Sequence, residues 1–259
     1  MTDRIASAAD RIAAARRLAE PLAVLPAAIR PRNEAEAYAV QDAVHERLPE
    51  LGRRVGTKIG CTTPVMQTYL GIPNPCAAGV FANSAFASGV TLNAGDYRRI
   101  GVECEIAVRL GRDLGAAEAP FSAATVADAV SEYMAAVEIV DDRYADWRTT
   151  DTPTLIAGDF FAAGCVLGRP VPAPLDVRDL VGVTTINDAE VGRGVGRDVM
   201  GDPLNALAWL ADNFAARGEL LRAGDIVLTG SLVETRWLAA GDRVTIAIDG
   251  LGDVSLSVV

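Results

Sequence analysis

The chain has 259 residues, of which 50% are hydrophobic and 22% are charged, so it can bury a large core and is not a disordered protein. Its formal net charge is −10 and no basic cluster stands out, which argues against nucleic acid or an anionic membrane as a partner. The four cysteines are scattered without a C-x-x-C pair, a pattern typical of a reduced, cytoplasmic protein that uses thiols as small core residues.

The first 50 residues predict helices. Residues 3–20 have apolar positions at helical spacing, and 33–48 form a second amphipathic helix with Asn33 as its N-cap. Charges interrupt the N-terminal stretch every few residues, so we expect neither a signal peptide nor a membrane span there. The only histidine, His45, lies among charged residues of the second helix, where we expect it to be solvated. Because it is the only histidine in the sequence, a His-based triad or a multi-histidine zinc site is not expected.

The next segment, from Ile59 to Gly95, contains no charged residue. Its prolines and glycines exclude a membrane-spanning helix. Two interpretations are compatible with each other: an irregular segment packed over the core, or the wall or lid of a largely apolar pocket.

After residue 90, strands outnumber helices and do not alternate regularly with them, which favours an α+β fold over a doubly wound parallel sheet. No linker divides the chain, so we expect a single domain over 1–259 with 1–50 as a helical N-terminal segment. The expected elements are strand 102–110, helix 122–134, strand 135–140, a hairpin at 182–196 turning at Asn187-Asp188, helix 203–217, strand 225–230, and two strands around a Gly-rich turn at 243–258.

The stretch VECEIAVRL, residues 102–110, places Glu103 and Glu105 two apart in an otherwise apolar run. Side chains alternate between the faces of a strand, so the apolar residues share one face and the glutamates share the other, about 7 Å apart along the strand. Two like charges repel each other, and more strongly where water is scarce. Plain solvent, a basic partner or a bound cation could compensate them.

Glu138 is a third carboxylate in an apolar run, between Val137 and Ile139. A buried unpaired carboxylate is costly, so this group is either exposed or partnered. Together with Glu103 and Glu105 it would supply three hard oxygen ligands, which suit Mg²⁺ or Mn²⁺ and do not suit structural zinc. The alternative is that the carboxylates lie on solvated strand faces.

Two further places in the chain offer polar groups beside apolar runs. Lys58 opens the uncharged segment, either as the polar end of a strand or as a catalytic group, because desolvation lowers the pKa of a lysine and makes it a usable base. The run LTGSLVE delivers Gly230 and Ser231 to the end of a buried strand, where Ser231 could donate hydrogen bonds to a substrate carboxylate. This run lacks the G-x-S-x-G frame, so a serine nucleophile is not expected.

Taken in order, these pieces resemble a family. They are GTKIGCTTPVMQTYLGIPNPCAAGVF, then VECEIAVRLGRDL, AAVEIVDDRYADW, GCVLG and LRAGDIVLTGSLV. The ordered set is similar to the 2-keto-4-pentenoate hydratase / 4-oxalocrotonate decarboxylase branch of the fumarylacetoacetate hydrolase superfamily, and the resemblance runs from about residue 33 to the end of the chain.

The resemblance implies a mixed β-roll with a helical N-terminal part, assembled into homo-oligomers. It also implies Mg²⁺ or Mn²⁺ held by Glu103, Glu105 and Glu138, with Lys58 at the place of the family's catalytic lysine and Ser231 near the substrate's carboxylate end. The family's substrates are 2-oxo or 2-hydroxydienoic acids, whose C1 carboxylate and 2-oxygen chelate the metal. An acidic protein can then capture an anionic acid, because the ion inverts the local field.

The chain departs from the family at two places. Hydratases of this branch usually carry an aspartate that can pair with the lysine, but the matching GVFANSA offers Asn83, which can hydrogen-bond to a substrate and cannot take up a proton. Where the family reads ADNAS, the chain reads AGDFFA, so Asp159 lies one place along and Phe160 and Phe161 would make the pocket tighter and drier. Asp159 could substitute as the acid–base group, or it could be a turn or cap carboxylate.

Our leading hypothesis is a cytoplasmic, Mg²⁺- or Mn²⁺-dependent hydratase-like lyase that acts on a small 2-keto acid in the catabolism of aromatic compounds. The second is a metal-dependent decarboxylase of an oxo-dienedioate such as 4-oxalocrotonate. Hydrolytic cleavage of an acylpyruvate is disfavoured, because no histidine is expected near the site to activate water. A catalytically altered relative that only binds a 2-keto acid is the non-enzyme alternative, favoured by the missing aspartate.

Overall fold

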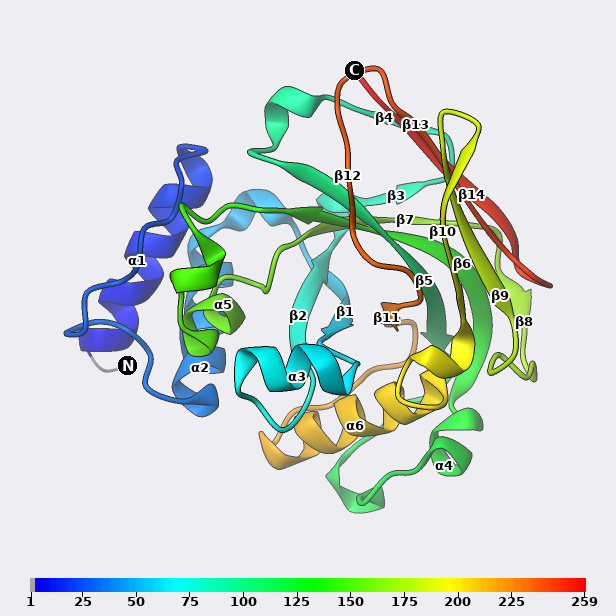
Figure 1. Ribbon diagram of the computed structural model, residues 1–259. Helices are drawn as coiled ribbons and strands as arrows, with labels where there is room; N and C mark the ends of the chain where they lie inside the picture. The colour runs from blue at the N-terminus through cyan, green and yellow to red at the C-terminus, as the bar shows by residue number, and fades with distance from the viewer. Residues whose placement is uncertain (1–2) are drawn as a thin grey trace.

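The computed structural model describes residues 3–259 as an α+β fold with two mixed sheets, as the sequence predicts. The larger sheet is curled, and the smaller one packs at its side (Figure 1). The main path of the larger sheet runs β2 (Cys76–Phe81), β1 (Arg54–Gly60), β11 (Ile226–Ser231), β5 (Ile100–Leu110), β6 (Val130–Asp141), β7 (Ala162–Leu167) and β3 (Ala85–Ala87), with β12 (Arg236–Trp237) paired to β5 and β8 (Val171–Pro172) paired to β6. The smaller sheet runs β10 (Ala189–Val195), β9 (Val181–Ile186), β13 (Arg243–Ile248), β14 (Gly252–Val258) and β4 (Val90–Leu92).

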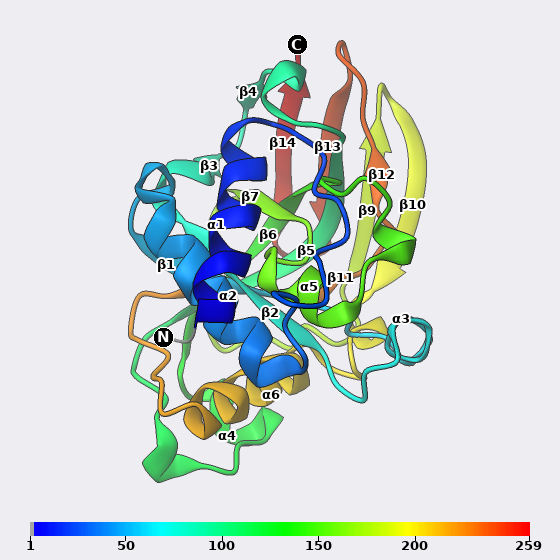
Figure 2. The same cartoon turned by 90° about the vertical axis from the view of Figure 1, so that its left-hand side faces the viewer.

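Helices cover two sides of the larger sheet. Three of them gather on the side away from the smaller sheet, and the view turned by 90° brings this helical side to the front (Figure 2). No helix within residues 3–259 combines the length and the apolar character needed to cross a membrane. The gathered helices are α1 (Asp3–Arg17), α2 (Glu34–Arg47) and α5 (Thr152–Ala157); the others are α3 (Pro64–Leu70), α4 (Ala123–Ala127) and α6 (Pro203–Ala216).

Several helices begin where their capping residues predict. The Asn33 side chain accepts a hydrogen bond from the backbone N–H of Glu36, 2.9 Å away, and starts α2. Asp202 caps α6 in the same way, and Pro203 occupies the first turn, where its missing N–H costs nothing. The N-terminal helical part is therefore confirmed, and α1 and α2 pack against each other over a shared set of buried apolar residues.

The structure corrects one expected element. The helix predicted at 122–134 ends at Ala127, and β6 has already begun at Val130. The reason is long-range pairing: β6 lies antiparallel to β5 from Leu110↔Val130 to Ile100↔Asp141, which satisfies backbone groups over the whole length and overrides the local helical signal. The hairpin predicted at 182–196 is confirmed as β9 and β10, with left-handed Asn187 and Asp188 at its turn.

The two faces of β5 have different neighbours. The alternating apolar residues of this strand, Val102, Cys104, Ile106 and Val108, belong to the main core cluster, as their spacing predicts. The opposite face continues as a second, smaller apolar cluster made of Val80, Ala107, Met134, Ala136, Cys165, Ile226 and Leu228.

Candidate active site

Strand register places a lysine and three glutamates on one face of the curled sheet. Residues that are register partners in neighbouring strands point to the same side. Lys58 of β1 pairs with Leu228 of β11, and Leu228 pairs with Ala107 of β5, so Lys58 shares the face of the smaller apolar cluster. Glu105 lies two residues from Ala107 on that face, and Glu103 lies two residues further along β5. Glu138 lies on the same face because it is the register partner of Glu103 in β6.

Glu103, Glu105 and Glu138 converge at this point. Glu103 and Glu138 are direct register partners across β5 and β6, and the three side chains offer oxygen atoms that all lie within 4.8 Å of one another. Glu105 and Glu138 are buried, and Glu103 is partly exposed. The buried Oε1 of Glu105 and both carboxylate oxygens of Glu138 accept no hydrogen bond from the described residues.

This donor set fits a divalent cation. Buried carboxylate oxygens without partners are costly, and one lysine does not neutralise three carboxylates. Hard cations such as Mg²⁺, Mn²⁺ or Ca²⁺ prefer clustered carboxylate oxygens, whereas a structural zinc site would use cysteine and histidine. The triad, by which we mean Glu103, Glu105 and Glu138, is therefore suited in composition and spacing to hold such an ion.

The electrostatics of the triad agree with its burial. Burial and the neighbouring charge of Glu138 raise the pKa of Glu103 to about 7. The pKa of Glu105 is raised well above its ordinary value, first by burial and then by the charges of Glu138 and Glu103. Without a cation, the triad thus resists full ionisation.

Two hydrogen bonds orient the triad. The backbone N–H of Gly230 donates to Glu105 Oε2 at 2.7 Å, and the hydroxyl of Thr235 donates to Glu103 Oε1. Thr235 has no motif around it that would identify it from sequence. Ser231 is the register partner of Glu105, and its hydroxyl donates to the carbonyl of Val233 at 2.6 Å. Ser231 and Gly230 therefore lie beside the triad, at the end of β11.

Lys58 contacts the triad from β1. Its Nζ forms an ion pair with Glu138 Oε1 at 2.9 Å and donates a hydrogen bond to the carbonyl of Phe160 at 2.8 Å. Burial alone would lower the pKa of Lys58, but the charges of Glu138 and Glu103 outweigh it and raise the pKa above its ordinary value. Desolvation therefore acts in the expected direction, but the net shift is upward because the two carboxylates outweigh it.

Asp159 lies close to this group but is bound to the N-terminal helices. Its Oδ2 accepts a hydrogen bond from Arg16 at 2.7 Å, and its Oδ1 lies 2.7 Å from Nε2 of His45. Burial would raise the pKa of Asp159, but His45 and Arg16 outweigh it and hold the pKa well below its usual range. The expectation that His45 is solvated is wrong: its side chain is only 11% exposed and hydrogen-bonds to Asp159, because α1 and α2 dock against the turn that carries Asp159.

Asn83 has different neighbours. It is exposed in the short 3-10 turn Ala82–Ser84, and its side-chain amide donates to the carbonyl of Glu50 at 2.9 Å. Its amide carbon lies near Gly52. No contact among the described residues brings Asn83 to Lys58 or to the triad, so the substrate contact inferred from its sequence position is not carried forward.

A series of aromatic rings connects the uncharged segment with Lys58. Tyr69 of α3 lies 5.7 Å from Trp147, which lies 6.0 Å from Phe161. Phe161 meets Phe160 edge-on at 5.5 Å, and the Phe160 ring centre is 5.4 Å from Lys58 Nζ. These rings form an apolar wall on one side of the lysine, which supports the interpretation of the uncharged segment as part of a pocket.

The curled mixed sheet, with an acidic triad and a lysine on one face, defines an α+β protein with a candidate site for a divalent cation. A family model described as "Fumarylacetoacetate (FAA) hydrolase C-terminal" matches residues 75–259. The chain is 37% identical to "2-keto-4-pentenoate hydratase" of Paraburkholderia phymatum, over 98% of this chain and 97% of that protein. The chain therefore belongs to the fumarylacetoacetate hydrolase family, and the resemblance seen in the sequence is confirmed.

Two further comparisons give a similar sequence and a similar solved structure. The chain is 33% identical to "2-hydroxyhexa-2,4-dienoate hydratase" of Comamonas testosteroni, over 84% of this chain and 85% of that protein. It superposes on the structure of 4-oxalocrotonate decarboxylase from Pseudomonas putida G7 complexed with magnesium and adipate, with a TM-score of 0.93, 26% identity, and coverage of 100% of this chain and 99% of that chain. The expected β-roll fold is confirmed by this superposition.

Proposed function

We propose that the protein is a divalent-metal-dependent hydratase of a small 2-hydroxydienoic (2-keto) acid, of the kind formed during the catabolism of aromatic compounds. The observation that carries the proposal is the triad beside Lys58, in which three buried carboxylate oxygens accept no hydrogen bond from the described residues. The names of the similar hydratases, which act on 2-keto-4-pentenoate and 2-hydroxyhexa-2,4-dienoate, support the substrate class.

Glu103, Glu105 and Glu138 would hold the cation, with Mg²⁺ or Mn²⁺ as the proposed ion. When bound, the ion would neutralise the triad and act as a Lewis acid for negative charge on the substrate's carboxylate and 2-oxygen. The magnesium named in the complex of the similar decarboxylase supports this choice of ion.

The chain's own residues have separate roles in this proposal. Lys58 holds a proton and a positive charge at Nζ, 2.9 Å from the triad, where it can hydrogen-bond to the 2-oxygen of a substrate or exchange a proton with it. Gly230 orients Glu105 through its backbone N–H. Ser231 would bind the substrate's carboxylate by turning its hydroxyl away from Val233. The aromatic wall excludes water from the side of Lys58 that faces Phe160.

The proposed reaction consumes one water molecule. Tautomerisation moves a proton from the 2-hydroxyl of the dienol to the terminal carbon and leaves a carbonyl conjugated to the remaining double bond. Water then adds its hydroxyl to the distal carbon of that bond and a proton to the carbon next to the carbonyl. The product is a 4-hydroxy-2-oxo acid, and no oxidant or reductant is required.

The direct test is turnover of 2-hydroxypenta-2,4-dienoate with Mg²⁺, with Mn²⁺ and with EDTA. We expect metal-dependent loss of the dienol absorbance without release of CO₂. The control is the Glu138→Gln variant, which removes one charge of the triad. Metal-independent turnover, or no turnover under any of these conditions, would contradict the proposal.

Decarboxylation of an oxo-dienedioate is the second candidate, because the similar solved structure is named a 4-oxalocrotonate decarboxylase. The same stabilisation of negative charge at the 2-oxygen would serve loss of CO₂. Incubation with 4-oxalocrotonate distinguishes the two activities, since CO₂ is released only by the decarboxylase. The absence of turnover, together with thermal stabilisation by oxalate or pyruvate plus metal, would instead indicate a protein that only binds 2-keto acids.

Assembly and location remain predictions. We propose a homo-oligomer, which sedimentation analysis would test. The free thiols of Cys61, Cys76, Cys104 and Cys165, all buried, support a reducing compartment and hence the cytoplasm.

A further inference from the structure

Three consecutive residues after α5 adopt the left-handed backbone conformation. The φ angles of Asp159, Phe160 and Phe161 are +66°, +43° and +68°. None of them is glycine, and L-residues rarely adopt this conformation, least of all in a row. Such a turn persists only where the surrounding structure holds it, and strained segments of this kind cluster at functional sites. We call residues 159–161 the left-handed turn.

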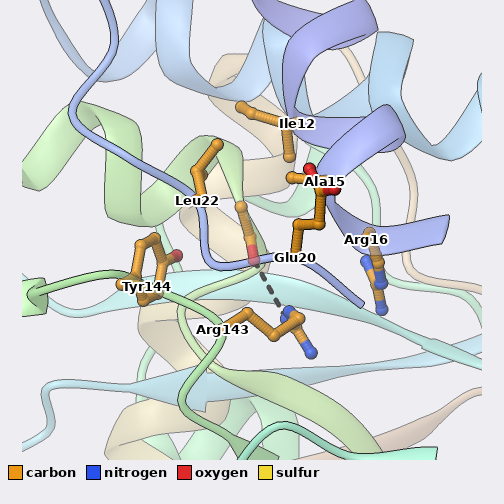
Figure 3. Close-up of a pocket in the computed structure, with 8 residues that line it drawn as sticks. Ile12, Ala15, Arg16, Glu20, Leu22, Arg143 and Tyr144 are labelled. Carbon is orange, nitrogen blue, oxygen red and sulfur yellow. Dashed lines mark hydrogen bonds between the residues drawn. The ribbon is translucent and has the colours of Figure 1, made fainter. Parts of the chain in front are cut away.

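The backbone carbonyls of this turn and its flanks are held from several directions. The Phe161 carbonyl accepts from the backbone N–H of Asp141 at 2.9 Å. Arg143 donates to the carbonyls of Gly158 and Ala162, at 3.1 and 2.9 Å, and Figure 3 shows the first of these bonds. The Asp159 carbonyl accepts from the backbone N–H of Ala162 at 2.9 Å, and the Phe160 carbonyl accepts the hydrogen bond of Lys58. The conformation of the turn thus determines the position of the Phe160 carbonyl, which accepts the hydrogen bond from Lys58.

The side chain of Asp159 fastens this turn to the N-terminal helices. Its carboxylate is 1% exposed, and each of its oxygens contacts one helix: Oδ2 meets Arg16 of α1, and Oδ1 meets His45 of α2. An ionised carboxylate only accepts hydrogen bonds, so Nε2 of His45 carries the proton in this contact. Arg16 also lines the small cavity drawn in Figure 3, together with Arg143.

We propose that Asp159 is a positioning residue: bound by Arg16 and His45, it holds the left-handed turn so that the Phe160 carbonyl stays against Lys58. The N-terminal helices thereby help to fix the lysine beside the triad. The consequence for catalysis rests on the proposed function, while the effect on the environment of Lys58 does not.

This assignment differs from an acid–base role for Asp159. Both carboxylate oxygens are engaged by cationic or N–H groups from the helices, and the group that reaches Lys58 is a backbone carbonyl of the turn. A proton-transfer role would require the carboxylate itself to reach the substrate. The two roles predict different results when Arg16 is changed and the carboxylate is kept.

The first experiment compares Asp159→Asn and Arg16→Gln in the Mg²⁺-loaded enzyme. Asparagine tolerates the left-handed conformation, so the first change removes the charge with little backbone cost. We expect kcat to fall by about 10- to 100-fold in both variants, with KM changed by less than about threefold, because a misplacement near 1 Å costs about this much in rate. Mn²⁺ affinity should be unchanged. The matched control is Arg17→Gln, since Arg17 is the next residue of α1 and pairs with the exposed Glu50.

The second experiment observes Lys58 directly. Lys58 is the only lysine in the sequence, so protein labelled with ¹³C-lysine has one lysine Cε resonance in its NMR spectrum. We expect this resonance to shift by more than its line width in Asp159→Asn and Arg16→Gln, and to superimpose on the wild type in Arg17→Gln. A purely structural loss would lower the melting temperature and leave the resonance of the folded protein in place.

The outcomes separate the alternatives. Loss of turnover in Asp159→Asn with normal turnover in Arg16→Gln would support the acid–base role and overturn the proposal. A fall in Mn²⁺ affinity that parallels kcat would also overturn it, because the contact would then act on the triad. If Asp159→Asn does not fold, Arg16→Gln carries the test, since its Asp159–His45 contact remains. If the wild type turns over no substrate, the proposed function fails, and the Lys58 resonance still decides the positioning role.

Discussion

Glu103 and Glu138 face each other directly across the antiparallel ladder of β5 and β6. Like charges in this arrangement destabilise a sheet, and these two lie where burial weakens the screening by water. Among the described residues, Lys58 forms an ion pair within 4 Å with Glu138 but not with Glu103. The strand pairing that completes the larger sheet therefore also creates a concentrated negative charge, and a bound cation is the group that would relieve it.

The first prediction concerns Glu105→Gln. Glu105 is fully buried and its Oε1 has no hydrogen-bond partner, so ionisation of this group is unfavourable in the metal-free protein. Because the pKa of Glu105 is raised, the folded metal-free protein must either protonate this carboxyl group or bury its charge, and glutamine avoids both costs. We expect the free energy of unfolding of the metal-free protein to rise by about 1–3 kcal/mol. Mn²⁺ affinity should fall by about 10- to 100-fold or more, because one ligand of the ion loses its charge. Thermal unfolding and titration calorimetry measure the two effects.

The control for that change is Glu132→Gln. Glu132 also lies on β6, but it is partly exposed and pairs with Arg109. A surface pair of this kind contributes at most about 1 kcal/mol, and Mn²⁺ affinity should not change. A Glu105→Gln variant that is less stable than the wild type without metal, and that keeps the full stabilisation by Mn²⁺, would show that Glu105 is not a ligand.

The second prediction is a dependence of stability on pH in the metal-free protein. Burial and Glu138 raise the pKa of Glu103 to about 7, above its value in the unfolded chain. The folded protein therefore binds more protons than the unfolded chain between the two values, and its stability is fully present below about pH 4.5 and is lost as the pH rises through about 7. We expect this group to change the free energy of unfolding by a few kcal/mol at most, since one pKa unit corresponds to about 1.4 kcal/mol.

Urea unfolding between pH 5 and pH 8 measures this effect. In the Glu103→Gln variant, the part of the pH dependence of stability that is due to Glu103 should disappear. Saturating Mn²⁺ should reverse the slope in the wild type, because binding favours the ionised triad and competes with protons. A metal-free wild type whose stability rises over this interval would contradict the raised pKa of Glu103.

The third prediction concerns Lys58→Met. Lys58 is 3% exposed and lies 2.9 Å from Glu138, so its loss removes the compensating charge and leaves the carboxylate more costly to bury. We expect turnover to fall by at least about 100-fold, because a proton-transferring group is lost. Mn²⁺ affinity should be kept or increased, since an ammonium repels a dication. Steady-state kinetics and titration calorimetry on the same preparation separate the effect on turnover from the effect on Mn²⁺ affinity. A variant with wild-type turnover would remove Lys58 from the mechanism.

Sequence reasoning found the parts of the site that depend on local periodicity. Strand alternation places Glu103 and Glu105 on one face, and an apolar run around Glu138 indicates that this carboxylate needs a partner. The resemblance to a family supplied the link with Lys58, which comes from a strand far away in the sequence. These residues are predictable because short-range pattern and motif order carry the information.

The contacts that sequence reasoning missed depend on how distant segments dock. Arg16 and Asp159 are 143 residues apart, and only the packing of α1 and α2 against the left-handed turn brings them together. For the same reason His45 was expected in solvent and instead lies largely covered, against Asp159. Thr235 reaches Glu103 because β12 returns along β5. No local pattern in the chain encodes these approaches.

The last prediction concerns Gly230→Ala. Gly230 has a φ of +119°, and a Cβ there would lie 2.6 Å from the Thr62 methyl carbon and 2.7 Å from its hydroxyl oxygen. The backbone N–H of Gly230 also orients Glu105. We expect the substitution to lower the free energy of unfolding by about 3–5 kcal/mol, from backbone strain and overpacking together, and to weaken Mn²⁺ binding. Chemical denaturation and calorimetry measure these changes.

Gly224→Ala is the matched control for that prediction. Gly224 also has a positive φ, +89°, but nothing lies within 4 Å of an added Cβ, so only the conformational cost of about 1–2 kcal/mol applies. The double variant Gly230→Ala/Thr62→Ala should regain the part of the free energy of unfolding that is lost through the steric clash, because it removes the two Thr62 atoms nearest to the added Cβ. Mn²⁺ affinity should then return toward that of the wild type. Equal destabilisation in Gly230→Ala and Gly224→Ala, with unchanged Mn²⁺ binding, would mean that the close approach of Thr62 and the hydrogen bond to Glu105 do not hold the triad in place.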